Sequence, residues 1–92
     1  MRGQHYKGKK NLISMQLRVM RVRRDVSQQE LAARMQVLGV SIDQQAISLI
    51  ENNKRAVTDY ELACFCKALK CSERDLLQDF YEKYRREEEE PS

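Results

Sequence analysis

The sequence predicts an all-α domain of five helices. Its 92 residues suit one domain around one core, because chains divide into several domains only at greater lengths. Helix-starting motifs recur along the chain, and apolar residues follow them at helical spacing. No stretch alternates apolar and polar residues in the way that a half-buried strand does. The predicted helices cover residues 12–24, 28–38, 44–52, 59–69 and 73–84.

The first of these helices is placed by its apolar spacing alone, because Ile13, Leu17 and Met20 fall on one helical face. Each of the other four begins with an apolar residue, a capping residue and a second apolar residue four positions into the helix. The capping residues are Ser27, Asp43, Thr58 and Ser72, and capping boxes are completed by Glu30, Glu61 and Asp75. The apolar pairs are Val26 with Leu31, Ile42 with Ile47, Val57 with Leu62, and Cys71 with Leu76.

Charge is distributed unevenly along the chain. Residues 1–24 contain eight Lys or Arg and no acid, whereas residues 72–92 contain four basic and eight acidic residues. We expect a basic flexible arm at 1–11, the folded domain at 12–84 and an acidic disordered tail at 85–92. A basic segment suits a polyanion such as nucleic acid, although a solvated tail that keeps the protein soluble explains the same charge.

Side chains that support catalysis are scarce. His5 is the single histidine, and the three cysteines, Cys64, Cys66 and Cys71, are too few for a structural zinc site with four ligands. Cys64 and Cys66 also point about 200° apart on one helix. We therefore expect no enzymatic activity, no metal and no cofactor. No apolar run is long enough to span a membrane and no signal peptide is recognisable, so we expect a cytoplasmic protein.

The clearest functional signal comes from the two predicted helices between Gln28 and Asn52, which are separated near Gly39. Helical spacing places the apolar residues of the second helix on one face, and the other face is polar and uncharged. That polar face contains Gln44, Gln45, Ser48 and Asn52. A Gln amide offers a donor and an acceptor that match N6 and N7 of adenine in the major groove. An ordinary solvated face is the alternative, but such faces usually mix Lys with Glu.

Three segments of the chain share a pattern with a known family. Ser27-Gln28-Gln29-Glu30-Leu31-Ala32 opens one helix, the run from Ala46 to Arg55 spans the next, and Ala68-Leu69 precedes Ser72 and Leu76-Leu77. On these residues the chain resembles the Cro and phage-repressor family of helix-turn-helix proteins, also called XRE-like, over roughly residues 12–78. The resemblance implies a lambda-repressor-like fold of five helices, with double-stranded DNA as the partner.

The resemblance also assigns roles to particular residues. It implies base readout by the start of the third helix, at Gln44, Gln45 and Ser48. It implies phosphate contacts by the start of the second helix and by the loop after the third, at Ser27, Gln28, Asn52, Lys54 and Arg55. Finally, it implies an ion pair between Arg21 and Glu51, which we interpret as structural because it would tie the first helix to the recognition helix.

The chain departs from the family pattern between the second and third helices. Glu30 and Glu51 are separated by about five residues more than is usual, which is typical of a variant with a lengthened turn. The sequence therefore does not determine the angle between these two helices. Leu49 replaces a frequent polar residue, and it either contacts a thymine methyl group or adds to the core. Asp25 and Lys70 stand where the family favours a helix-ending glycine.

Apolar and aromatic residues follow one stripe near the C-terminus. They exceed what a small four-helix core can bury in one copy, so we expect a homodimer with an interface at Leu77, Phe80, Tyr81 and Tyr84. The alternative is that these rings cover the base of a single copy. A two-fold dimer would match a palindromic operator with half-sites about 34 Å apart.

These features predict a sequence-specific DNA-binding transcriptional regulator of the Cro/C1 type, acting as a repressor. The alternative is a protein-interaction module, such as an antitoxin or an adaptor with the same fold, because fold alone does not establish function. An aromatic patch that stays exposed in the dimer would favour this alternative.

Overall fold

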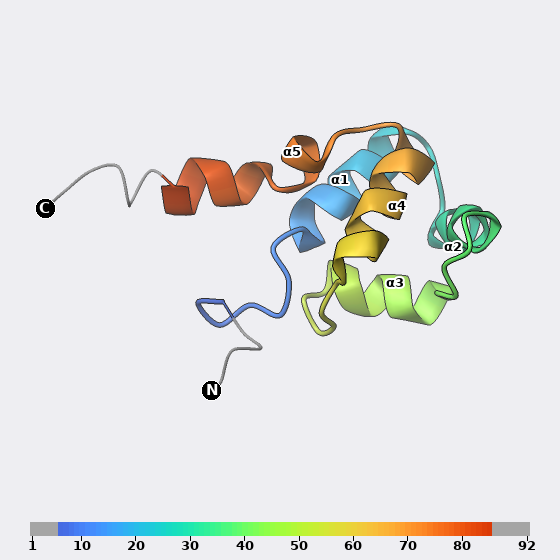
Figure 1. Ribbon diagram of the computed structural model, residues 1–92, viewed down its shortest axis with the longest axis horizontal. Coiled ribbons are helices and arrows are strands. Elements are labelled where there is room, and N and C mark those ends of the chain that lie inside the picture. The colour runs from blue at the N-terminus through green and yellow to red at the C-terminus, as the bar shows by residue number, and fades with distance from the viewer. Residues whose placement is uncertain (1–5, 86–92) are drawn as a thin grey trace, which may run out of the picture.

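The computed structural model describes residues 6–85, with the backbone alone at Tyr84 and Arg85, and it is all-α as predicted (Figure 1). Its helices are α1 (Ser14–Arg23), α2 (Gln28–Val37), α3 (Gln44–Glu51), α4 (Asp59–Leu69), α5 (Glu73–Leu76) and a π-helix, η1 (Phe80–Arg85). In Figure 1, α2 and α3 lie at one end of the molecule and η1 projects from the other. The parts of the predicted arm and tail at 1–5 and 86–92 lie outside the described residues.

The predicted helix at 73–84 is interrupted in the structure, so the prediction of one continuous helix was wrong. α5 ends one residue before Leu77, and the chain then rewinds into the wider turns of η1. In this path the Phe80 ring lies 6.1 Å from the Tyr6 ring and 5.5 Å from the Tyr81 ring, measured between ring centroids. Ring packing against the N-terminal segment therefore accompanies the change of helix type. The helical spacing of residues in the sequence does not predict this change.

One hydrophobic core joins all the α-helices. Its fully buried members are Leu17, Leu31, Met35, Ile47, Ile50, Phe65, Leu69 and Leu76. α3 contacts both α1 and α2, so its orientation is set from two sides. Cys66 is also buried, and burial raises the pKa of its thiol to about 12, which keeps the side chain neutral in its role as a small apolar residue.

The helix starts follow the capping motifs. Capping boxes form at Ser27, Thr58 and Ser72. Asp43 Oδ1 accepts a hydrogen bond from the backbone N–H of Ala46 at 2.8 Å, which fixes Gln44 as the first residue of α3. α1 differs from these helices, because Ile13 precedes it and supplies no side-chain cap.

The turn between α2 and α3 is packed against the core. Gly39 follows α2 at a φ of +89°, a conformation that favours glycine. Val40 and Ile42 are 6% and 3% exposed, and Gln36 Nε2 donates to the carbonyl of Ile42 at 3.3 Å. This buried turn fixes the direction in which α3 leaves α2.

Two other helix ends use left-handed residues in place of glycine. Asp25 follows α1 at a φ of +57°, and Lys70 ends α4 at a φ of +56°. The guanidinium of Arg24 donates to the carbonyls of Leu69 at 2.8 Å and Lys70 at 3.2 Å. Arg24 therefore satisfies the last carbonyl groups of α4 and joins that helix to the end of α1.

Candidate nucleic-acid interface

A buried carboxylate at the end of α3 organises the candidate interface. Glu51 is 5% exposed and accepts two hydrogen bonds from Arg21, from Nε at 2.7 Å and from Nη2 at 3.1 Å. Burial alone would raise the pKa of Glu51, but the hydrogen bonds from Arg21 and Gln28 outweigh it and hold the pKa below its ordinary value of 4.5. The same hydrogen bond raises the pKa of Arg21. The ionised pair ties α1 to α3.

Two glutamines extend from this carboxylate to the surface. Gln28 Nε2 donates to Glu51 Oε1 at 3.0 Å, and Gln44 Nε2 donates to Gln28 Oε1 at 3.5 Å. Because an ionised carboxylate only accepts, the Gln28 amide must turn its NH2 group toward Glu51 and its oxygen toward Gln44. The first residue of α3 is therefore oriented from the core through one chain of hydrogen bonds.

The exposed side of α3 contains the residues predicted to read bases. Gln44 and Gln45 are exposed, and Ser48 is half-buried. Leu49 is 38% exposed and lies outside the buried core, which leaves its methyl groups near the surface. These side chains begin at the N-terminal end of α3, where the helix dipole is positive.

The loop after α3 contains two predicted phosphate contacts in different situations. Lys54 is exposed. Arg55 forms a two-point ion pair with Glu61, in which Nη1 to Oε1 and Nη2 to Oε2 both measure 3.1 Å. The hydrogen bond to Glu61 raises the pKa of Arg55, and the pair joins the loop to α4. The sequence placed Glu61 in the capping box of Thr58 and did not reveal this second contact.

Arg18 of α1 adds a cation at the same end of α3. Its Nη2 donates to the carbonyl of Glu51 at 3.4 Å and to Asn52 Oδ1 at 3.3 Å. Asn52 in turn donates through Nδ2 to the carbonyl of Ser48 at 2.8 Å. The side chain of Arg18 remains 49% exposed, so its charge reaches the surface of the candidate interface. Sequence analysis did not single out this arginine.

Asn53 holds the N-terminal segment against the loop. Its Oδ1 accepts the backbone N–H of Lys10 at 2.7 Å, and its Nδ2 donates to the carbonyl of Asn11 and to Ser14 Oγ, both at 3.0 Å. Its φ of +59° is left-handed, which asparagine tolerates better than most residues. That tolerance is the one local signal that marks this position in the sequence.

Asn11 completes the connection from the other side. It is 8% exposed, and its Nδ2 donates to the carbonyls of Ile50 at 3.1 Å and Arg55 at 2.9 Å. We refer to Asn11 and Asn53 together as the asparagine clasp. The clasp anchors the predicted flexible arm at residues 10 and 11, so ordered packing begins earlier than the predicted boundary at residue 12.

The N-terminal end of α3 is exposed and rich in amide side chains, and it lies beside α2 and near a basic loop. This arrangement defines a helix-turn-helix DNA-binding domain, with α2 and α3 as the two helices. A family model of helix-turn-helix domains matches residues 17–76, which is more than half of the chain. The chain belongs to this family, in its Cro and phage-repressor (XRE-like) form, and it is a DNA-binding helix-turn-helix protein. A search of the curated proteins finds no match.

The residues predicted to form a dimer interface lie on the α5 and η1 side of the molecule. Leu77, Phe80 and Tyr81 are half-buried within one copy. The Tyr81 ring also lies 4.5 Å from the guanidinium carbon of Arg74, so part of this surface is covered internally. The side chain of Tyr84 lies outside the described residues.

Within residues 6–85, no group of His, Cys, Asp and Glu is arranged to hold a metal ion. Cys64, Cys66 and Cys71 are free thiols. Among the helices of this same part of the chain, none has the length and apolar character that crossing a membrane requires.

Proposed function

We propose that this protein is a sequence-specific transcriptional regulator, acting as a repressor, that reads the major groove with the N-terminal end of α3. The observation that carries the proposal is the chain of hydrogen bonds from Glu51 through Gln28 to Gln44. This chain presents an oriented amide at an exposed helix end, and such an amide matches N6 and N7 of adenine. Gln45 and Ser48 lie on the same helix and supply further base contacts.

Phosphate contacts flank the recognition helix in this proposal. Ser27 and Gln28 lie at the positive N-terminal end of α2, where backbone amides and the helix dipole favour an anion. Lys54 and Asn52 supply a cation and a donor from the other end of α3. Arg55 contributes through the shape of the loop, because its guanidinium is held in the ion pair with α4.

The regulator acts as a homodimer in the cytoplasm. Leu77, Phe80, Tyr81 and Tyr84 form the surface that meets the second copy. A two-fold dimer presents two copies of α3, which fit half-sites about 34 Å apart in a palindromic operator. This spacing is a geometric consequence of placing both helices in successive major grooves on one side of the duplex.

Selection of bound sequences from a random DNA pool tests the proposal. The selected duplex and a scrambled duplex are then titrated at two salt concentrations. We expect a palindromic motif and a specificity ratio above about 10³. Salt-sensitive binding of both duplexes with equal affinity would contradict sequence-specific regulation.

A protein-interaction function, as in an antitoxin or an adaptor, is the second candidate. Val22, Val37 and Tyr60 are 62%, 86% and 60% exposed. Large exposed apolar side chains mark protein contacts when they form a continuous patch. Failure to enrich any motif in the selection would favour this second function.

A further inference from the structure

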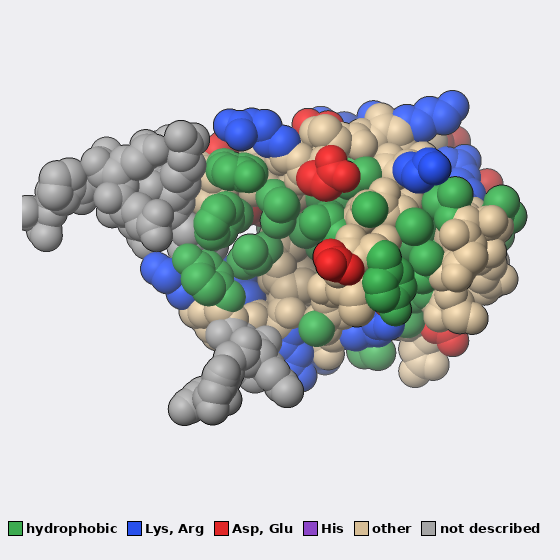
Figure 2. Space-filling model, in the orientation of Figure 1, with side chains coloured by type: hydrophobic (Ala, Val, Ile, Leu, Met, Phe, Trp, Pro, Cys, Tyr) green, Lys and Arg blue, Asp and Glu red, His purple; other side chains and the backbone are tan. Residues whose placement is uncertain are grey.

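The last turns of α2 and α4 meet at an open groove with a volume of about 340 Å³. The residues that line it are Arg34, Val37, Leu38, Lys67, Ala68 and Lys70. In Figure 2, Lys and Arg side chains lie beside hydrophobic ones at the upper right, where Figure 1 places α2 and the end of α4. None of the lining residues is among the proposed DNA contacts, so the groove has no part in the proposed base reading.

Part of the lining is apolar. Val37 is 86% exposed, which is a large exposure for a branched apolar side chain, and Leu38 beside it is half-buried. Covering the Val37 methyl groups with a partner removes apolar surface from water. The groove therefore suits a partner that brings apolar side chains.

The charged residues of the lining are all cationic. The acids of α2 and α4 are Glu30, Asp59 and Glu61, and all three lie in the first turns of these helices, whereas the groove is formed by the last turns. Glu30 and Glu61 are also engaged in the capping boxes of Ser27 and Thr58. The charge of the lining is therefore positive and favours carboxylates.

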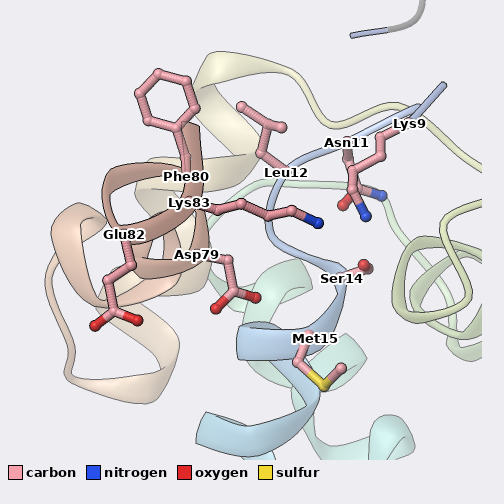
Figure 3. A pocket seen from close by; sticks show the side chains of 9 residues that line it. All are labelled: Lys9, Asn11, Leu12, Ser14, Met15, Asp79, Phe80, Glu82 and Lys83. Carbon is pink, nitrogen blue, oxygen red and sulfur yellow. The ribbon is translucent and has the colours of Figure 1, made fainter. Parts of the chain in front are cut away.

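A larger pocket between the N-terminal segment, α1 and η1 has no such preference (Figure 3). Its lining places Asp79 and Glu82 beside Lys9 and Lys83. Such mixed charges favour neither an anion nor a cation, so this pocket does not identify a ligand.

The two lysines of the groove are not needed to satisfy the end of α4. Arg34 Nη1 donates to the carbonyl of Ala68 at 2.9 Å, and Arg24 donates to the carbonyls of Leu69 and Lys70. Lys67 and Lys70 are exposed, and across the described part of the chain no hydrogen bond or ion pair engages either ammonium group. Both cations therefore remain available to a partner.

The backbone at Lys70 adds a second observation. This residue ends α4 at a φ of +56°, a conformation that glycine adopts without strain and lysine does not. The strained position gains nothing from the lysine side chain within the described structure. What the lysine supplies there is an ammonium group at the groove.

We propose that this groove docks an acidic segment of a partner protein, in which apolar side chains alternate with carboxylates. The apolar side chains pack against Val37 and Leu38, and the carboxylates pair with Lys67 and Lys70. A nucleic acid would match the cations alone, whereas a segment of this kind also covers the exposed Val37. The docking surface goes beyond the proposed DNA reading and does not depend on it.

The test uses the full, isotope-labelled chain without DNA, so that it is separate from the test of DNA binding. The probe is the peptide Ac-EELLEELLEE-NH2, followed by NMR at the Val37 methyl groups and the Lys70 amide. We expect a saturable shift with a Kd at or below about 1 mM. Two control peptides separate the contributions, because Ac-QQLLQQLLQQ-NH2 lacks the carboxylates and Ac-EESSEESSEE-NH2 lacks the apolar side chains. Each should bind at least about fivefold more weakly.

Three substitutions locate the site. Lys70→Gly removes an ammonium group and relieves the backbone strain, so this variant should bind the probe about threefold more weakly while being at least as stable as the unmodified protein. Lys67→Gln should have a similar effect, and the two together should weaken binding about tenfold. Val37→Ser removes methyl groups from an exposed position and should weaken binding about threefold.

Each kind of substitution has a matched control outside the groove. Lys10→Gln changes an exposed lysine whose backbone N–H, and not its side chain, bonds to Asn53. Val22→Ser changes a valine of α1 that is 62% exposed. Neither residue lines the groove, so both variants should bind the probe as tightly as the unmodified protein.

Four results would overturn the proposal. The first is the absence of a saturable shift up to about 5 mM probe. The second is unchanged affinity in the variant that combines Lys67→Gln with Lys70→Gly. The third is displacement of the probe by a random DNA duplex, with loss of duplex binding in that same variant, which would assign the groove to nucleic acid. The fourth is a shift at Val37 that grows with protein concentration without peptide, which would assign it to a second copy.

Discussion

Glu51 receives hydrogen bonds from Arg21 and Gln28 although burial opposes its ionisation. Replacing this carboxylate removes an acceptor shared by three elements, because Arg21 lies on α1, Gln28 on α2 and Glu51 on α3. The side chain of Arg21 is only 14% exposed, so leaving its guanidinium without this partner is costly. The consequence at the residue scale is that one buried acid stabilises the fold and also orients the proposed base-reading amide.

Acid should destabilise the fold through Glu51. Its folded-state pKa lies below 4.5, so the ionised form adds stability above about pH 4.5, and that stability is lost as the pH falls through the folded-state pKa. Glu51→Gln cannot ionise. It should be less stable than the unmodified protein at neutral pH, and it should lose less stability between about pH 5 and about pH 3. Urea unfolding across this range measures both effects, and equal losses in the two proteins would contradict the expectation.

Gln44 and Lys54 should affect DNA binding in different ways. Gln44→Ala should cost about 1–3 kcal/mol on the selected operator and relax the base preference at one position, because it removes an oriented amide. Lys54→Ala should weaken binding to all sequences alike and lower the salt dependence by about one ion. Titrations of both variants on the selected and scrambled duplexes measure the difference. Equal effects of the two substitutions on both duplexes would refute the assigned roles.

At the scale of elements, the sequence predicts most helix starts because caps are local. Ser27, Asp43, Thr58 and Ser72 act within one turn of the backbone that they cap, so their effect is visible without tertiary structure. The break near Leu77 was not visible in this way. This break accompanies packing between the rings of Tyr6 and Phe80, which are far apart in the sequence. The helical spacing of apolar residues does not reveal such a contact.

The asparagine clasp was missed for a related reason. Each asparagine is an ordinary polar residue in the sequence, and their importance arises only when the N-terminal segment reaches the loop after α3. The base-reading residues and the Arg21–Glu51 ion pair could be proposed from the sequence because a family pattern assigns their positions. The clasp joins segments that are far apart in the sequence, so it needed the folded chain. The Arg55–Glu61 pair is local, but it depends on how the loop after α3 enters α4.

Asn53→Gly should loosen the N-terminal segment while keeping the backbone conformation, because the Asn11 half of the clasp remains. Glycine adopts the φ of +59° without strain, so the variant isolates the loss of the side-chain hydrogen bonds. We expect a loss of about 1–3 kcal/mol in the free energy of unfolding, measured with urea. Asn53→Ala should lose about 1 kcal/mol more, because alanine is strained at this φ. Unchanged stability of the glycine variant would show that the Asn53 half of the clasp contributes nothing to the fold.

At the scale of the whole molecule, several of the basic residues counted in the sequence also hold the fold together. Arg21, Arg24, Arg34 and Arg55 all donate to internal carbonyls or carboxylates. These arginines stabilise the packing of the helices against one another. Part of the excess of basic residues near the N-terminus therefore serves the fold. Among the described residues, the exposed lysines, Arg23, Arg74 and the half-exposed Arg18 supply further surface cations.

The proposed homodimer makes a prediction about the molecule as a whole. Tyr81 is half-buried in one copy, and a charge at this position would have to be desolvated in an interface. Tyr81→Glu should therefore sediment as the 10.9 kDa monomer at micromolar concentration, whereas the unmodified protein should sediment at twice that mass.

The same substitution should change how DNA is bound. A monomer contacts one half-site, so Tyr81→Glu should bind a full palindrome no more tightly than an isolated half-site. Tyr60→Glu is the matched control, because Tyr60 is 60% exposed on α4 and lies outside the proposed interface. It should remain dimeric and keep its preference for the palindrome. If the unmodified protein is a strict monomer in solution and on the operator, the rings on η1 serve only to cover the base of one copy.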